Sequence, residues 1–199
     1  MKIVKAEEID IIEVLKILEN DGIIIYPTET LYGIGVKYNS KKLLRKLFEI
    51  KKRPEEKSFP LIVNLQHLDL ITEFIPSIAK KFIEKYWPGP LTLLLPAKKN
   101  LPKRITKDNK IAVRMPGESF ALKLIQLSQF PITATSANIS GYPAADCVET
   151  VMKYFKDSFI DLLIDGGKLP GIPSTIVDAT VDPPQLIRKG AIEVDLSFY

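Results

Sequence analysis

Residues 22–35 read GIIIYPTETLYGIG, in which a run of isoleucines gives way to hydroxyl groups, a carboxylate and then two glycines. Residues 23–26 have the length and the β-branching of a buried strand. Pro27 cannot donate to a sheet, so we expect strand pairing to stop there. The polar residues 28–30 then follow the strand's end, where open α/β sheets usually hold ligands. A strand followed by an ordinary polar turn is equally consistent with this stretch.

Helices and strands alternate on both sides of this stretch. Gly22 is placed to end the first helix, Ser40 to cap the second, and Pro76 to begin the third. The last two strands are short and are separated by a Pro-Pro turn, which predicts antiparallel additions to a mixed sheet. The expected helices are 7–20, 41–50, 75–87, 118–129 and 146–156, and the expected strands are 23–26, 60–65, 91–97, 111–116, 131–138, 159–165, 174–180 and 184–190. With no repeat and no flexible linker, residues 1–199 are expected to form a single α/β domain.

Composition narrows the class of protein. An apolar fraction of 46% in 199 residues is enough for a full core. One cysteine, Cys147, and one histidine, His67, disfavour disulfides and zinc clusters. The net charge of +4 suits an anionic partner such as a nucleotide or RNA, although 24 acidic residues are interspersed among 28 basic ones. No stretch is long and apolar enough for a membrane span or a signal peptide, so we expect a soluble, cytoplasmic protein with no membrane contact.

Several polar clusters follow apolar strands or helices and are candidates for chemistry. Arg114 lies in the otherwise apolar strand IAVRMP, where it must find an anion or reach solvent. The cluster at residues 51–57 combines lysines and an arginine and is the expected phosphate contact, unless it is only a solvated helix end. The clusters are PTET (27–30), KKRPEEK (51–57), TSANISG (135–141) and GGKLPGIPST (166–175).

Motifs of covalent catalysis and of the common nucleotide folds are absent from the sequence. There is no GxxxxGK[ST], GxGxxG, HExxH or GxSxG, and a Ser-His-Asp triad would depend wholly on His67. The remaining chemistry is that of a polar, cationic cavity that orients anionic reactants, as in phosphoryl and nucleotidyl transfer.

Taken together, the clusters resemble the YrdC-like family of threonylcarbamoyl-AMP synthases over the whole chain. The matching motifs are PTETLYGIG (27–35), K-x-R at 51–53 followed by PLIV, WPGPLTLLL (87–95), IAVRMP (111–116), TSANISG (135–141), STIVD (174–178) and LIRKG (186–190). The resemblance implies a twisted mixed sheet, parallel and antiparallel, with flanking helices around a large positively charged cavity. It also implies synthesis of L-threonylcarbamoyladenylate and pyrophosphate from L-threonine, bicarbonate and ATP, with Mg²⁺. A partner complex would then transfer the threonylcarbamoyl group to tRNA.

The same resemblance assigns roles to individual residues. It implies ATP-binding roles for Lys51, Arg53, Lys57, Asn138, Asp146 and Arg188, and threonine-binding roles for Thr30, Asn64, Arg114, Ser136 and Ser174. Lys51, Arg53, Ser136 and Asn138 would be catalytic. No metal ligand can be assigned, and Glu29 is a speculative general base that is equally consistent with a structural acceptor.

Two positions depart from the family pattern. Asn64 stands where many relatives have a histidine, and it cannot titrate. Asp146 stands where a hydroxyl is common and would repel phosphates unless it faces away or helps to hold a metal. These departures keep two alternatives open: a paralogue with the same fold and pocket but no synthase activity, and a module that binds double-stranded RNA or tRNA.

Overall fold

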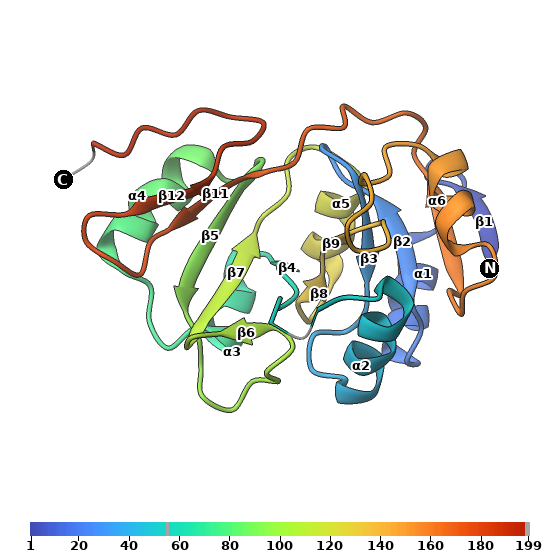
Figure 1. The fold of residues 1–199 in the computed structure, drawn as a ribbon, viewed down its shortest axis with the longest axis horizontal. Helices are drawn as coiled ribbons and strands as arrows, with labels where there is room; N and C mark the ends of the chain where they lie inside the picture. Colours follow the sequence, from blue (N-terminus) through green and yellow to red (C-terminus); the bar gives the residue numbers. More distant parts are fainter. Residues whose placement is uncertain (55, 198–199) are drawn as a thin grey trace.

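The computed structural model describes residues 1–54 and 56–197 and contains two mixed β-sheets flanked by helices (Figure 1). The first sheet has the order β1 (Lys2–Lys5), β10 (Leu162–Asp165), β2 (Ile24–Pro27), β3 (Tyr32–Gly35) and β9 (Thr135–Ser136). The second has the order β12 (Gln185–Arg188), β11 (Thr175–Asp178), β5 (Leu91–Pro96), β7 (Lys110–Arg114), β4 (Leu61–Ile62) and β8 (Ile132–Thr133), and β6 (Thr106–Lys107) pairs with β7. The predicted α/β class with a mixed sheet and flanking helices is confirmed, but the described strands form two sheets instead of one.

The described helices, except the unpredicted α3 (Leu68–Ile71), agree with the periodicity of the sequence. They are α1 (Ile11–Glu19), α2 (Lys41–Lys51), α3 (Leu68–Ile71), α4 (Ser77–Tyr86), α5 (Phe120–Leu127) and α6 (Val148–Phe155), with a 3₁₀ turn η1 (Leu65–His67) before α3. Ser40 caps α2 by accepting a hydrogen bond from Leu43 N, as predicted, and α4 begins directly after Pro76. No helix of the described residues has the length and hydropathy needed to cross a membrane.

Near the N-terminus, two predicted features are confirmed with small shifts and one strand was missed. Pairing of β2 ends at Pro27, as predicted, but Pro27 itself is the last paired residue, opposite Tyr32 in the antiparallel β2–β3 hairpin, because proline lacks only the N–H. Gly22 lies just beyond the end of α1, where its N–H donates to Ile17 O at 2.8 Å, although the left-handed residue is Asp21 (φ 60°). The strand β1 was not predicted, because its pairing with the distant β10 is invisible in local sequence.

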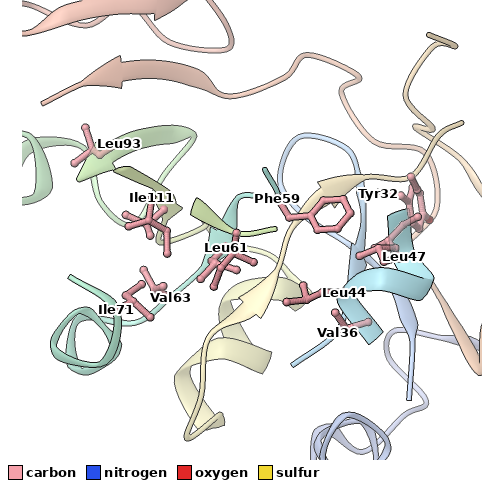
Figure 2. Close-up of a cluster of buried hydrophobic side chains, with 14 of the residues drawn as sticks. Tyr32, Val36, Leu44, Leu47, Phe59, Leu61, Val63, Ile71, Leu93 and Ile111 are labelled. Carbon is pink, nitrogen blue, oxygen red and sulfur yellow. The ribbon is translucent and has the colours of Figure 1, made fainter. Parts of the chain in front are cut away.

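The larger of two hydrophobic clusters contains residues of both sheets and joins them. Figure 2 shows Tyr32 and Val36, from β3 and the residue after it, on one side of the buried cluster. Leu93 of β5 and Ile111 of β7 lie on the other side, and Phe59 of the α2–β4 connection and Leu61 of β4 lie between the two sides. The segment 166–174 also connects the sheets, since it runs from the end of β10 to the start of β11 (Figure 1).

Candidate active site

A cavity of about 750 Å³ lies where segments of the two sheets meet. Its walls combine the β2–β3 hairpin, the α2–β4 connection, strands β5 and β7, the turn after β9, segment 166–174 and the end of β12. The ionisable groups on its lining include three arginines and one aspartate. The lining residues that carry side-chain hydrogen-bonding groups are Thr28, Thr30, Tyr32, Arg53, Ser58, Thr92, Arg114, Thr135, Ser136, Asn138, Tyr142, Asp146, Ser174 and Arg188.

Arg114 is the buried cation of one wall. Its residue is 8% exposed, at the end of β7, and its Nη1 donates to Thr30 Oγ1 at 3.1 Å. The same Nη1 lies 3.4 Å from Glu29 Oε1, and neither carboxylate oxygen of Glu29 accepts a hydrogen bond from the described residues. Thr28 shapes this loop, because its Oγ1 accepts from Thr30 N and Leu31 N and donates to Leu31 O. Arg114 thus retains hydrogens for an anion in the cavity.

Ser174 is held from two directions beside this wall. Its Oγ lies 2.8 Å from the buried Thr92 Oγ1, and Arg188 donates to Ser174 O at 3.1 Å and 2.8 Å. Burial, followed by the charge of Arg114, lowers the pKa of Arg188. Two arginines this close favour the arrival of an anion between them.

Arg53 projects from the α2–β4 connection with a fixed guanidinium. Its Nε donates to Lys57 O at 2.9 Å, its Nη2 donates to Ser58 O at 2.7 Å, and its Cζ lies 5.0 Å from the centre of the Phe59 ring. Burial lowers the pKa of Arg53 to about 10, so it remains charged at neutral pH. Nη1 has no hydrogen-bond partner among the described residues, so it is available to a phosphate oxygen.

The end of β9 carries Ser136 into the cavity wall, and the turn after β9 carries Asn138 there. Ser136 pairs with Gly33 in the sheet, and its Oγ donates to Asn138 Oδ1 at 2.7 Å. Asn138 Nδ2 donates to Tyr142 O at 2.7 Å. Beneath these bonds, Lys51 Nζ donates to Ser136 O, and to Asn138 O and Oδ1 at 2.7 Å and 3.1 Å. Burial and the charge of Arg53 lower the pKa of Lys51 to about 7.

Segment 166–174 closes another side of the cavity. Gly171 N donates to Thr30 O at 3.0 Å, and Leu169 N donates to Asp146 O at 2.8 Å. The Asp146 carboxylate forms an ion pair with Lys168 at 2.7 Å, and the hydrogen bond from Lys168 lowers the pKa of Asp146. The negative charge of Asp146 is therefore balanced by the positive charge of Lys168.

Comparison with known proteins gives this cavity a context. A family model named Sua5_yciO_yrdC, with the description "Telomere recombination", matches residues 16–190. The chain belongs to the Sua5/YciO/YrdC family. The predicted family resemblance is thereby confirmed.

Members of the Sua5/YciO/YrdC family with different names resemble this chain. It is 39% identical over 178 residues to threonylcarbamoyl-AMP synthase of Pyrococcus abyssi, covering 87% of this chain and 52% of that protein. It is 35% identical over 201 residues to a putative threonylcarbamoyl-AMP synthase of Methanocaldococcus jannaschii, covering 97% and 95% of the two chains. The chain thus spans about half the length of the curated P. abyssi relative, and nearly all of the M. jannaschii one.

Solved structures show the same fold. The crystal structure of P. abyssi Sua5 complexed with L-threonine matches with a TM-score of 0.89 and 36% identity, over 96% of this chain and 58% of that chain. The crystal structure of Escherichia coli YciO matches with a TM-score of 0.83 and 27% identity, over 94% and 91% of the chains. The E. coli YciO protein is described as uncharacterized. Both a synthase and a protein of unassigned activity in the Sua5/YciO/YrdC family therefore share this architecture.

Most of the residues predicted from the family resemblance come together on one cavity. Those that line it are Thr30, Arg53, Arg114, Ser136, Asn138, Asp146, Ser174 and Arg188. Lys51, Lys57 and Asn64 are not among the lining residues. The side chain of Lys57 is exposed and only its carbonyl group contacts Arg53. Asn64 instead caps η1, accepting from His67 N at 3.0 Å and donating to Ile125 O at 3.1 Å.

Several lining residues were missed by sequence reasoning, among them Thr92 and Tyr142. Thr92 lies within the motif WPGPLTLLL, which was used only as a rigid turn and a strand, yet its hydroxyl faces Ser174. Tyr142 follows Gly141 and is 61% exposed at the cavity. The strand alternation around Thr92 was the signal that could have located it, because the polar residue interrupts an apolar run.

Proposed function

We propose that this chain is an L-threonylcarbamoyladenylate synthase, a nucleotidyltransferase that uses L-threonine, bicarbonate and ATP. The observation that carries the proposal is the placement of two anion anchors on one cavity. Arg114 with Thr30 stands on one wall, and Arg53 with Ser136 and Asn138 stands on another. The names of the P. abyssi and M. jannaschii relatives, and the L-threonine complex of P. abyssi Sua5, support the same reading.

The threonine end is built around Arg114. A guanidinium beside a hydroxyl would hold the amino-acid carboxylate by charge-assisted hydrogen bonds. The Thr92–Ser174 pair supplies buried hydroxyl groups that can recognise the substrate hydroxyl. Such a partner is needed because shape alone separates near-isosteres such as threonine and valine by only about a hundredfold.

The nucleotide end would use Arg53 on the phosphates, with Asn138, Asp146 and Arg188 near the nucleoside. Among the described residues, no group of three or more acidic, histidine or cysteine side chains could hold a metal, and Asp146 is the carboxylate on the cavity lining. This fits a Mg²⁺ ion that arrives with ATP, because Mg²⁺ in such sites is held by one or two carboxylates and substrate phosphates. Bound there, Mg²⁺ would neutralise charge on the triphosphate.

The reaction requires positioning more than side-chain chemistry. The neutral threonine amine condenses with bicarbonate and releases one water molecule, which forms an N-carboxylate. One carboxylate oxygen attacks the α-phosphorus of ATP in line, and the bond to pyrophosphate breaks. Arg53 would stabilise the departing pyrophosphate, and Arg114 would hold the threonine carboxylate away from the phosphorus. The product would pass to a transfer complex that acts on tRNA.

The test is release of pyrophosphate from ATP by the purified protein with Mg²⁺. Release should require both L-threonine and bicarbonate, and L-valine should replace L-threonine poorly. Release that is independent of the amino acid would contradict the proposal. The variant Arg114→Met should lose the pyrophosphate release that depends on L-threonine, whereas Arg45→Met, on the exposed face of α2, should retain it.

A second candidate is a paralogue that binds nucleotide or double-stranded RNA without synthase activity. It is favoured by the location of Asn64 outside the cavity lining and by the match to uncharacterized YciO over 92% of the chain. Salt-dependent RNA binding that survives replacement of Ser136 and Asn138, with no pyrophosphate release, would select this candidate.

A further inference from the structure

Lys51 ends helix α2, and its side chain is directed into the protein. The residue is 1% exposed and is absent from the cavity lining, whereas Arg53, two positions later, lines the cavity. The two basic residues of the K-x-R motif therefore face different surroundings. They should not be assigned the same role.

All three hydrogens of the Lys51 ammonium have an acceptor. Nζ donates to Ser136 O, to Asn138 O at 2.7 Å and to Asn138 Oδ1 at 3.1 Å. An ammonium group has three donors and no acceptor, so a phosphate oxygen could bind only by displacing one of these oxygens. No carboxylate pairs with Lys51 in the part of the chain that the structure describes, so a salt bridge does not explain its burial.

The backbone of Lys51 holds the same turn from its other end. Lys51 O accepts from Ser140 N at 2.9 Å, so residues 136–140 are fixed by both the side chain and the main chain of one residue. The Lys51 contact to Asn138 Oδ1 also orients the amide whose Nδ2 bonds to Tyr142 O. Without the ammonium, Asn138 O would lose its donor, and Ser136 O would keep only the bond from Asn138 N at 2.9 Å. The Asn138 amide would be held only by Ser136 Oγ and Tyr142 O.

We infer that Lys51 is a positioning residue that fixes the turn 136–140 so that Ser136 and Asn138 face the cavity, and that it does not bind phosphate. Arg53 is then the phosphate contact of the K-x-R motif. The part of this inference that concerns ATP rests on the proposed function, but the role of Lys51 in the turn does not.

The first experiment measures hydrogen exchange in the ligand-free protein. Lys51→Met has nearly the same shape without the charge, and Arg53→Met is the matched control from the same motif. The backbone amides of Ser140 and Ala145 donate hydrogen bonds within or beside the turn. They should exchange at least tenfold faster in Lys51→Met, and their exchange rates should not change in Arg53→Met. Unchanged exchange in folded Lys51→Met would overturn the inference, whatever the protein's activity.

The second experiment uses the unaltered protein, so it does not depend on a variant that folds. With ¹⁵N-labelled lysine and at a pH well below the Lys51 pKa of about 7, the Lys51 ammonium should give a slowly exchanging signal without ligand, because it is buried and fully hydrogen-bonded. Its chemical shift should stay the same when inorganic pyrophosphate or ATP is added. A signal that shifts strongly on addition of either probe would make Lys51 a phosphate ligand and overturn the inference.

Calorimetry separates positioning from a general loss of structure. In Lys51→Met, ATP affinity should fall at least tenfold and L-threonine affinity should fall less. Of the expected threonine contacts only Ser136 lies on the turn that Lys51 holds, whereas Arg114 and Ser174 are held by other contacts. Equal losses for both ligands, or no loss for ATP, would overturn the positioning role. Failure of the unaltered protein to bind ATP would instead contradict the proposed function and leave the exchange result to decide the inference.

Discussion

At the scale of single residues, the cavity depends on side chains that are fixed before any ligand arrives. Arg53 is clamped by two carbonyl groups and the Phe59 ring, and Ser174 by Thr92 and Arg188. Groups held in this way need little rearrangement on binding, so less conformational entropy is lost. Substitutions of these supports should therefore act on affinity as well as on stability.

Replacing Arg114 should abolish most of the affinity for L-threonine. Arg114→Met removes the guanidinium next to Thr30, and truncation of a buried, hydrogen-bonded charge costs about 2–5 kcal/mol. Titration calorimetry with L-threonine measures the effect, with Arg45→Met as the control. Because Glu29 loses its cation in the same variant, thermal unfolding should also occur at a lower temperature. Undiminished affinity would remove Arg114 from the threonine site.

Replacing Thr92 should have a smaller effect on the binding of L-threonine than replacing Arg114. Thr92→Val keeps the shape but removes the hydroxyl group that meets Ser174 Oγ at 2.8 Å. The loss of one neutral hydrogen bond is about 1 kcal/mol, so the KM for L-threonine should rise about fivefold. Thr92→Ser restores the hydroxyl group and should restore the KM. If Thr92→Ser raised the KM for L-threonine as much as Thr92→Val does, the hydroxyl group at this position would not take part in threonine binding.

At the scale of elements, helix α2 sets the position of the K-x-R motif, and its start is capped by Ser40. Ser40→Ala should lower the free energy of unfolding by about 1 kcal/mol, because Leu43 N loses its acceptor. Urea unfolding measures the change. Ser77→Ala, in α4 whose N-cap is Pro76, is the control and should have a smaller effect.

A partly buried ion pair spans three strands of the second sheet. Lys110 on β7 contacts Asp178 on β11 at 2.6 Å across β5, and Thr180 donates twice to the same carboxylate. Burial alone would raise the pKa of Asp178, but the hydrogen bonds from Lys110 and Thr180 hold it below its usual value.

This depressed pKa predicts how stability depends on pH. The contribution is fully present above the unfolded pKa of an aspartate, about 3.9, and is lost as the pH falls through the lower folded value. Asp178→Asn should lose about 1–3 kcal/mol at pH 7 and should unfold with a shallower pH dependence below pH 4 than the unaltered protein. Acid unfolding followed by circular dichroism checks both. Parallel acid curves for the two proteins would contradict the assignment.

The elements were largely predictable from the sequence, and the reasons for the failures are physical. Apolar periodicity and the capping residue Ser40 are local signals, so α2, α4, α5 and β5 follow directly from them. The edge strand β1 and the division into two sheets depend on pairing between distant segments, which no local pattern encodes. The gathering of Arg53, Arg114 and Ser136 on one cavity came from family motifs. The inward direction of the Lys51 side chain could not be predicted in this way, because a motif and its spacing give the residue type but not the direction of the side chain.

At the scale of the whole molecule, ligands should act as a link between the two sheets. Thr30 belongs to the hairpin of the first sheet, Arg114 to β7 of the second, and a bound threonine would contact both. A ligand at a hundredfold excess over its Kd stabilises the folded state by about 2.7 kcal/mol. The unfolding temperature should therefore rise with ATP, and rise further with ATP and L-threonine together. A melting temperature unaffected by either ligand would contradict a shared cavity.

The walls of the cavity are contributed by segments spread from Thr28 to Arg188. No contiguous fragment carries the anion anchors, so the site cannot be transplanted onto another scaffold as a peptide or inherited piecemeal by recombination. Each anchor can contribute to binding only when the other anchors are already in place around the cavity. Selection would then act on all of these anchors together, and loop sequences could vary freely only where they do not face the cavity.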